Sequence, residues 1–207
     1  METALAAWLL LAAASPASVS SPTEVIQVAV GQVVRVVQDT DLARPAAAER
    51  RGAEIRGIVE NLFDFPEMTR RCLGQHWANR TAQEREEFVH LFTSILEHSY
   101  FGKIENYSGG KMLYISETMD GDDATVRSRV IIGGKDEVSV DYRLHLVGSR
   151  WAVYDVLIHG VSIVSTYRAQ FNRIIRISSY DHLVEKMRLK EQELRTLEQS
   201  ALAKERP

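Results

Sequence analysis

The stretch 151-WAVYDVLIHGVSIVSTYRAQFNRII-175 changes its hydrophobic period part-way along, and this change organises the interpretation of the whole chain. Its first eight residues are rich in Val, Trp, Tyr and Ile, which favour strands. Beyond Gly160 the apolar side chains recur at helical spacing. We therefore expect a strand over 150–158 that turns near Gly160 into a helix over 162–176.

Three more segments with a period of two precede this stretch, and glycine-bearing turns separate them. The segments are 111-KMLYISE-117, 124-ATVRSRVII-132 and 137-EVSVDYRLHL-146. The turns are 120-DGDD-123, 133-GGKD-136 and 148-GS-149. Because such short connections join antiparallel neighbours, the sequence predicts a four-stranded antiparallel meander.

Helical patterns flank the predicted meander on both sides. Thr81 and Glu84 form a capping box that opens a strongly amphipathic helix. The expected helices are 23–38, 46–63, a short one from Pro66, 81–100, 162–176 and a charged one over 181–205. This order predicts an α+β fold, NTF2-like in shape, with N-terminal and C-terminal helices packed on one face of the sheet.

The N-terminus carries the apolar run 4-ALAAWLLLAAA-14, followed by the small-residue stretch 15-SPASVSS-21. The run is about half of the ~20 residues that span a bilayer, and the pair is typical of a secretory signal. The residues before it, 1-MET-3, include no Lys or Arg, so a buried N-terminal helix is the alternative. We expect a signal peptide over 1–20, one domain over 21–190 and a charged helical or disordered tail over 191–207.

Composition and motifs exclude several kinds of chemistry. The net charge is −3, and no basic stripe predicts a nucleic-acid partner. The single cysteine, Cys72, is interpreted as a small apolar residue of a helix. Glu86 and His90 stand four apart on one predicted helix, but no further ligand at suitable spacing supports a metal site. No phosphate-binding loop or nucleophile elbow is present, so we expect no catalytic residues, no metal and no cofactor.

Alternation divides the predicted sheet into a polar and an apolar face. On the polar face we place Asp155 beside Arg127, Arg129, Asp141 and Arg143. A carboxylate among cross-strand arginines holds strands together. We therefore interpret Asp155 as structural rather than as a catalytic acid.

The apolar face is unusually large. In the fourth strand we expect Ala152, Tyr154, Val156 and Ile158 to form one apolar ladder on it. The helices that begin near Thr81 and Ser162 add further apolar stripes. These side chains either form a closed core or line a cavity for an apolar ligand, and the pattern allows both.

Several segments, in this order along the chain, resemble the MlaC family, also called the toluene-tolerance auxiliary family. The similarity runs from about Val25 to Lys190 and is most specific in the pattern Tyr-Asp-Val, Gly-Val-Ser and Tyr-Arg-x-Gln-Phe. The segments are 81-TAQEREEFVHLFTSIL-96, 107-YSG-109, 140-VDYRL-144 and 153-VYDVLIHGVSIVSTYRAQFNRII-175.

The resemblance implies a soluble periplasmic carrier, not an enzyme, that holds phospholipid as cargo and helps maintain outer-membrane lipid asymmetry. Its implied partners are an outer-membrane lipoprotein complex and the MCE-domain protein of an inner-membrane ABC transporter. Carried over to this sequence, it implies that the apolar ladders hold the acyl chains. The expected lipid-binding residues are Phe92, Leu96, Tyr100, Val130, Ile132, Val140, Tyr142, Leu144, Leu146, Tyr154, Val156, Ile158, Val161, Ile163 and Tyr167.

Three other hypotheses remain at this point. The same fold could carry a different lipid, such as a hopanoid. A small NTF2-like enzyme could use Asp155 or a histidine. A structural adaptor could bind a partner through the charged C-terminal helix.

Overall fold

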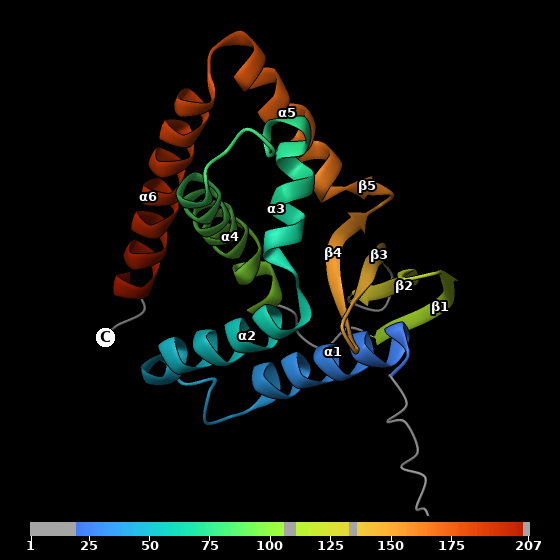
Figure 1. Cartoon of the computed structure of the whole chain (residues 1–207). Helices are drawn as coiled ribbons and strands as arrows, with labels where there is room; N and C mark the ends of the chain where they lie inside the picture. Colours follow the sequence, from blue (N-terminus) through green and yellow to red (C-terminus); the bar gives the residue numbers. More distant parts are fainter. Residues whose placement is uncertain (1–19, 106–110, 133–135, 205–207) are drawn as a thin grey trace, which may run out of the picture.

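The computed structural model describes residues 20–105, 111–132 and 136–204, and confirms the α+β class (Figure 1). The helices are α1 (Pro22–Gln38), α2 (Ala48–Leu62), α3 (Phe65–Leu73), α4 (Ala82–Glu105), α5 (Ile163–Ile177) and α6 (Tyr180–Lys204). Short 3-10 turns at Pro45–Ala47 and Gly74–His76 precede α2 and follow α3. The strands are β1 (Lys111–Asp120), β2 (Asp123–Ile132), β3 (Asp136–Val147), β4 (Arg150–Ile158) and β5 (Val161–Ser162).

The sheet is the predicted antiparallel meander with one addition. Its order is β1-β2-β3-β4-β5, so the strand count is five rather than four. The extra strand arises because the chain reverses over His159 and Gly160, whose φ angles are +50° and +78°. Two successive positive φ values suit a tight hairpin, and this one pairs Ile158 with Val161.

A β-bulge corrects the expected faces of β4. Arg143 pairs with Asp155, but the next residue, Leu144, pairs with Val153, so β4 carries one extra residue at this point. A bulge changes which side chains share a face. Val153 therefore packs with Val156 in one cluster, and Tyr154 packs in the other. The predicted ladder that placed Tyr154 beside Val156 is wrong.

The helices begin where their sequences provide caps. Ser21 and Glu24 form a capping box at α1, and Thr81 and Glu84 exchange the same pair of hydrogen bonds, of 3.2 and 2.7 Å, before α4. Asp64 caps α3 by accepting the Glu67 N–H. These caps satisfy N–H groups that a helix leaves unpaired in its first turn.

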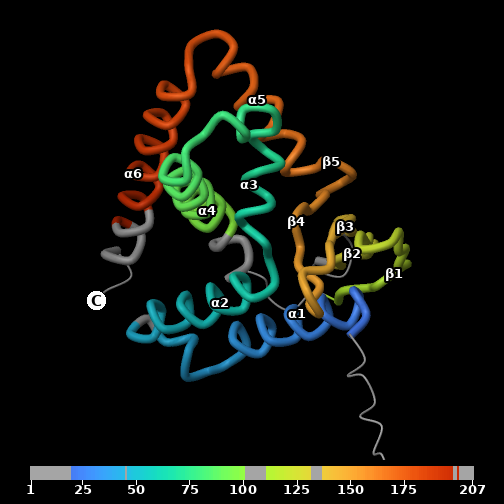
Figure 2. The backbone as a smooth tube through the Cα atoms, in the orientation of Figure 1, coloured from blue at the N-terminus to red at the C-terminus, as the bar shows by residue number. Residues whose placement is uncertain are grey.

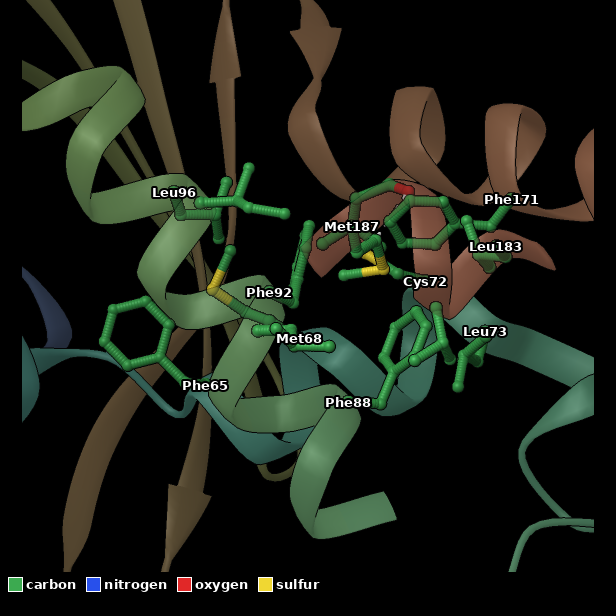
Figure 3. Packing of buried hydrophobic residues seen from close by; sticks show 14 of the residues in the cluster. Phe65, Met68, Cys72, Leu73, Phe88, Phe92, Leu96, Phe171, Leu183 and Met187 are labelled. Carbon is green, nitrogen blue, oxygen red and sulfur yellow. Dashed lines mark hydrogen bonds between the residues drawn. The ribbon is translucent and has the colours of Figure 1, made fainter. Parts of the chain in front are cut away.

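The buried residues form two clusters. In the helical cluster, α3, α4, α5 and α6 direct Phe, Leu and Met side chains toward one another, and Phe88 and Phe92 are fully buried there (Figure 3). In the sheet cluster, Ile26 and Ala29 of α1 and Leu62 of α2 cover part of the sheet. Figure 2 shows α1 and α2 running side by side, and α4 beside α6, in agreement with their contacts.

The ends of the chain were expected to be a leader and a tail. Residues 1–19 of the expected leader lie outside the described residues. The charged C-terminal segment is helical as far as Lys204, and its first half packs against α4 through Leu183, Val184 and Met187. Within the described residues, every helix is too short or too polar to cross a membrane.

Candidate functional site

The apolar face of the sheet is buried at one end and half-covered at the other. At the buried end, Val126, Leu144 and Val153 are inaccessible to solvent beneath α1 and α2. The half-covered end is continuous with it across β1 to β4 and reaches the start of α5. Its partly buried side chains are Met112, Tyr114, Val140, Tyr142, Ile158 and Ile163. We name this set the open apolar end and treat it as the candidate site.

Backbone pairing brings the open apolar end together. Met112 pairs with Val130, and Tyr114 lies one step along, opposite Ser128. Ser128 pairs in turn with Val140, which pairs with Ile158 on β4. Since directly paired residues in a sheet lie on the same face, these side chains form one surface across four strands.

Ser128 lies within this surface, and its hydroxyl is satisfied locally. The side chain is buried, and its Oγ donates to the carbonyl oxygen of Val140 on the neighbouring strand. A hydroxyl bonded in this way exposes little polarity to its surroundings. The serine therefore adds little polarity to the surface.

An anchored helix closes the buried end. Glu117, in the second half of β1, accepts hydrogen bonds from the backbone N–H and the hydroxyl of Thr23, at 2.8 and 2.6 Å. Thr23 lies in the first turn of α1, where a carboxylate also interacts favourably with the helix dipole. This contact fixes α1 over the sheet and marks where the half-covered surface begins.

The predicted lipid-binding residues lie in several different parts of the structure. Those in the sheet cluster are Val140, Tyr142, Leu144, Leu146, Val156, Ile158 and Ile163. Those in or against the helical cluster are Phe92, Leu96, Tyr100, Tyr154, Ile163 and Tyr167. Val130 is half-buried on β2, Val161 is 62% exposed in β5, and the side chain of Ile132 lies outside the described residues.

Two members of the open apolar end were not among the predicted residues. Met112 and Tyr114 belong to the segment 111–117, which was predicted as a strand. Both faces of that segment carry apolar residues, because Leu113 and Ile115 alternate with the other two. The register of β1 against β2 shifts between Tyr114 and Ser116, so the pairing of Met112 with Val130 depends on a bulge that the sequence does not signal.

Asp155 contacts Arg143, as expected from the sequence, but it is buried rather than part of an open polar face. It is 2% exposed and lies 3.3 Å from the guanidinium of Arg143, its partner on β3. It also accepts hydrogen bonds from the hydroxyl of Ser162 at 2.7 Å and from the backbone N–H of Val164 at 3.1 Å. Arg129, which was expected in the same group, pairs instead with Glu137.

A second polar group lies between the sheet, at β3 and β4, and the start of α3. His145 Nε2 is 3.0 Å from Asp64, and its ring meets the edge of Tyr154. The guanidinium of Arg71 lies over the Tyr154 ring, 3.7 Å from its centre, and pairs with Glu67. The contacts of His145 with Asp64 and of Arg71 with Tyr154 join the sheet to α3, so the group is explained as packing.

Ionisable groups in the helical cluster are held neutral. Burial raises the pKa of Cys72 to about 12, and its sulfur contacts the carbonyl oxygen of Val164 at 3.7 Å. Burial likewise raises the pKa of Tyr167 to about 12. A thiol in this state is a poor nucleophile.

Two hollows on the described surface lie between helices. One of about 410 Å³ separates α1 from α2, and one of about 660 Å³ lies among α2, α4 and α6. Charged side chains such as Arg56, Glu60 and Glu97 line the larger one, and none of the predicted lipid-binding residues lines either. Among residues 20–105, 111–132 and 136–204, His, Cys, Asp and Glu form no group of three suited to a metal.

The fold and site together define an α+β protein whose helices cover an antiparallel sheet and leave one end of its apolar face partly open. The family model of the MlaC protein matches residues 27–189. The chain therefore belongs to the MlaC family, as its sequence patterns indicated.

Relatives of known description agree with this assignment. The intermembrane phospholipid transport system binding protein MlaC of Haemophilus influenzae is 28% identical over 122 residues, which are 56% of this chain and 57% of that protein. This chain thus matches little more than half the length of that relative. A phospholipid-binding protein from Ralstonia solanacearum, solved in complex with a phospholipid, has a TM-score of 0.74 at 24% identity. The match covers 84% of this chain and 99% of that one, and it supports the fold.

Proposed function

We propose that this protein is a phospholipid carrier and that the open apolar end of its sheet holds acyl chains. The main observation behind the proposal is the open apolar end. Its side chains, from Met112 to Ile163, are only partly buried, whereas the rest of the apolar face of the sheet is well packed. Exposed or half-exposed apolar surfaces of this kind mark binding sites in soluble proteins. Membership of the MlaC family supports the same cargo.

The energetics of extraction favour an apolar surface without catalytic groups. Two acyl chains contain about 30 methylenes, each worth ~0.8 kcal/mol when removed from water. A soluble carrier must offer comparable burial, whereas polar head-group contacts add only a few kcal/mol each. Val, Tyr, Met and Ile side chains supply this surface, and the carrier has no need of a covalent step.

Membership of the MlaC family also supports a proposal for where the protein works and with what it exchanges lipid. The protein would work in the periplasm and exchange phospholipid with an outer-membrane lipoprotein complex and with an inner-membrane ABC transporter that bears an MCE-domain protein. This exchange would maintain the lipid asymmetry of the outer membrane. The open apolar end has the chemistry for acyl chains, and the polar groups around Asp155 and His145 are satisfied by structural contacts.

The first test is to identify what the protein carries. Purified protein should release a phospholipid on organic extraction and show the matching mass increment by native mass spectrometry. Protein that is lipid-free, and that takes up nothing from vesicles of phosphatidylethanolamine and phosphatidylglycerol, contradicts the proposal. An extracted mass belonging to a hopanoid keeps the carrier and changes the cargo.

A matched pair of substitutions on β3 tests the site. Val140→Asp places a carboxylate on the open apolar end, at a cost of about 2 kcal/mol or more against acyl chains, which is roughly thirtyfold in affinity. Val147→Asp makes the same change at a residue of β3 that is exposed and outside this surface. Vesicle binding assays should show the loss for Val140→Asp alone. Equal affinity in the two folded variants would place the cargo elsewhere.

A further inference from the structure

The carboxylate of Asp155 closes the first turn of α5. Its Oδ1 accepts the backbone N–H of Val164 at 3.1 Å, and its Oδ2 accepts the Ser162 hydroxyl at 2.7 Å. The Ser162 oxygen in turn accepts the backbone N–H of Ser165 at 2.9 Å. Two N–H groups that the helix leaves unpaired are thus satisfied by one chain of hydrogen bonds that starts on β4.

The charge of this carboxylate is balanced on both sides. Arg143 approaches from β3 at 3.3 Å, and the N-terminus of α5 adds the positive end of the helix dipole. Asp155 is almost completely buried, whereas the Arg143 side chain is partly exposed. A buried carboxylate that loses one of these partners is strongly disfavoured, so the contacts are expected to break and form together.

The residues on either side of this junction are members of the open apolar end. Ile158 ends β4, the chain turns at His159 and Gly160, and Ile163 begins α5 directly after the two residues of β5. Figure 1 shows β4, β5 and α5 following one another at this junction. Ile163 packs against both the sheet cluster and the helical cluster. Its position therefore depends on how closely the first turn of α5 is held to β4.

We propose that Asp155 is a positioning residue that controls lipid release by holding the first turn of α5 against the edge of the open apolar end. While Asp155 binds Ser162 and Val164, Ile163 closes the side of the surface next to Ile158. When these hydrogen bonds are lost, α5 moves away from β4 more often and bound lipid leaves faster. The inference rests on the proposed function, because it concerns the rate at which that same surface exchanges its cargo.

The experiment compares lipid release from loaded protein. Protein loaded with a fluorescent phosphatidylglycerol is mixed with acceptor vesicles, and the rate of transfer is followed. Asp155→Asn should release lipid about tenfold faster than the original chain, since a charge-assisted hydrogen bond is worth about this factor. Unchanged release from Asp155→Asn that still carries lipid would overturn the proposal.

A second pair covers the case in which Asp155→Asn does not fold. Ser162→Ala removes the hydroxyl that Asp155 binds, and Ser162→Thr retains it. Release should be faster for the alanine variant and close to the original rate for the threonine variant. Equal rates for these two variants would overturn the proposal.

A substitution at the cap of another helix distinguishes a positioning role of Asp155 from a general effect on stability. Asp64→Asn weakens the cap of α3 and its contact with His145, which lie outside the open apolar end. Its melting temperature should fall while its release rate stays near the original value. If Asp64→Asn accelerates release as much as Asp155→Asn does, the positioning role is wrong. An original chain that carries no lipid at all would instead contradict the proposed function itself.

Discussion

Cys72 illustrates how surroundings decide the behaviour of a single residue. It is the only cysteine in the sequence, and its side chain lies in the helical cluster at 1% exposure. Burial raises the pKa of its thiol to about 12, and the nearby charge of Asp155 adds to this shift. Since the thiolate is the reactive form, Cys72 is a packing residue here.

We predict that Cys72 resists alkylation in the folded protein. Iodoacetamide at mildly alkaline pH should leave the native chain unmodified over a time that fully labels the chain in urea. Intact-mass spectrometry measures the extent of alkylation of the native chain and of the chain in urea. Rapid labelling of the native protein would show that the helical cluster opens far more readily than its packing indicates.

The residue patterns of the apolar face were only partly predictable. Val140, Tyr142 and Ile158 were correctly placed on it, because plain alternation holds in β3 and at the end of β4. Tyr154 was misplaced, because the bulge opposite Arg143 and Leu144 shifts the pattern by one residue. A bulge depends on the register between two strands, which local sequence does not specify.

At the scale of elements, local signals accounted for most boundaries. The capping box at Thr81 and Glu84 is formed as the sequence predicted, and the alternating segments became strands with short turns. The two-residue β5 was not predicted, because Val161 and Ser162 are too few to give a period. It exists because the hairpin at Gly160 returns the chain alongside β4.

We predict that Thr81→Ala destabilises the protein by about 1 kcal/mol, since the hydroxyl accepts the N–H of Glu84 in the first turn of α4. Urea unfolding followed by circular dichroism gives this free energy. Thr196→Ala is the matched control, because the Thr196 hydroxyl donates to the carbonyl oxygen of Gln192 in its own helix and the side chain lies on the surface; a change within about 0.5 kcal/mol is expected there. Equal effects from both would mean that α4 does not depend on this cap.

At the scale of the whole molecule, the apolar side chains divide between two clusters. The sequence predicted large apolar stripes on the sheet and on the helices, and it left open whether they close into a core. In the structure Phe92 and Leu96 are buried in the helical cluster, whereas Val140 and Tyr142 are only partly buried in the sheet cluster. Which stripes meet is decided by tertiary packing, so periodicity alone could not show whether the two groups line one cavity.

Ionisable groups in the helical cluster also make the free energy of unfolding decrease as the pH rises through the alkaline range. Burial is the main cause that raises the pKa values of Cys72, Tyr167 and Tyr180 to about 12 each. Their ordinary values are 9.0 for the thiol and 10.0 for the phenols. At pH values between the ordinary and the raised pKa values, the unfolded chain loses protons that the folded chain keeps. Ionisation of these groups therefore favours unfolding.

We therefore predict full stability below about pH 9 and a progressive fall in melting temperature as the pH rises toward about 12. Thermal unfolding followed by circular dichroism over this range measures the slope. Tyr167→Phe removes one of the three ionisations while keeping the ring that packs edge-on against Phe92, so its melting temperature should fall less steeply with pH. The same slope in both proteins would mean that Tyr167 ionises in the folded state and that the helical cluster admits water.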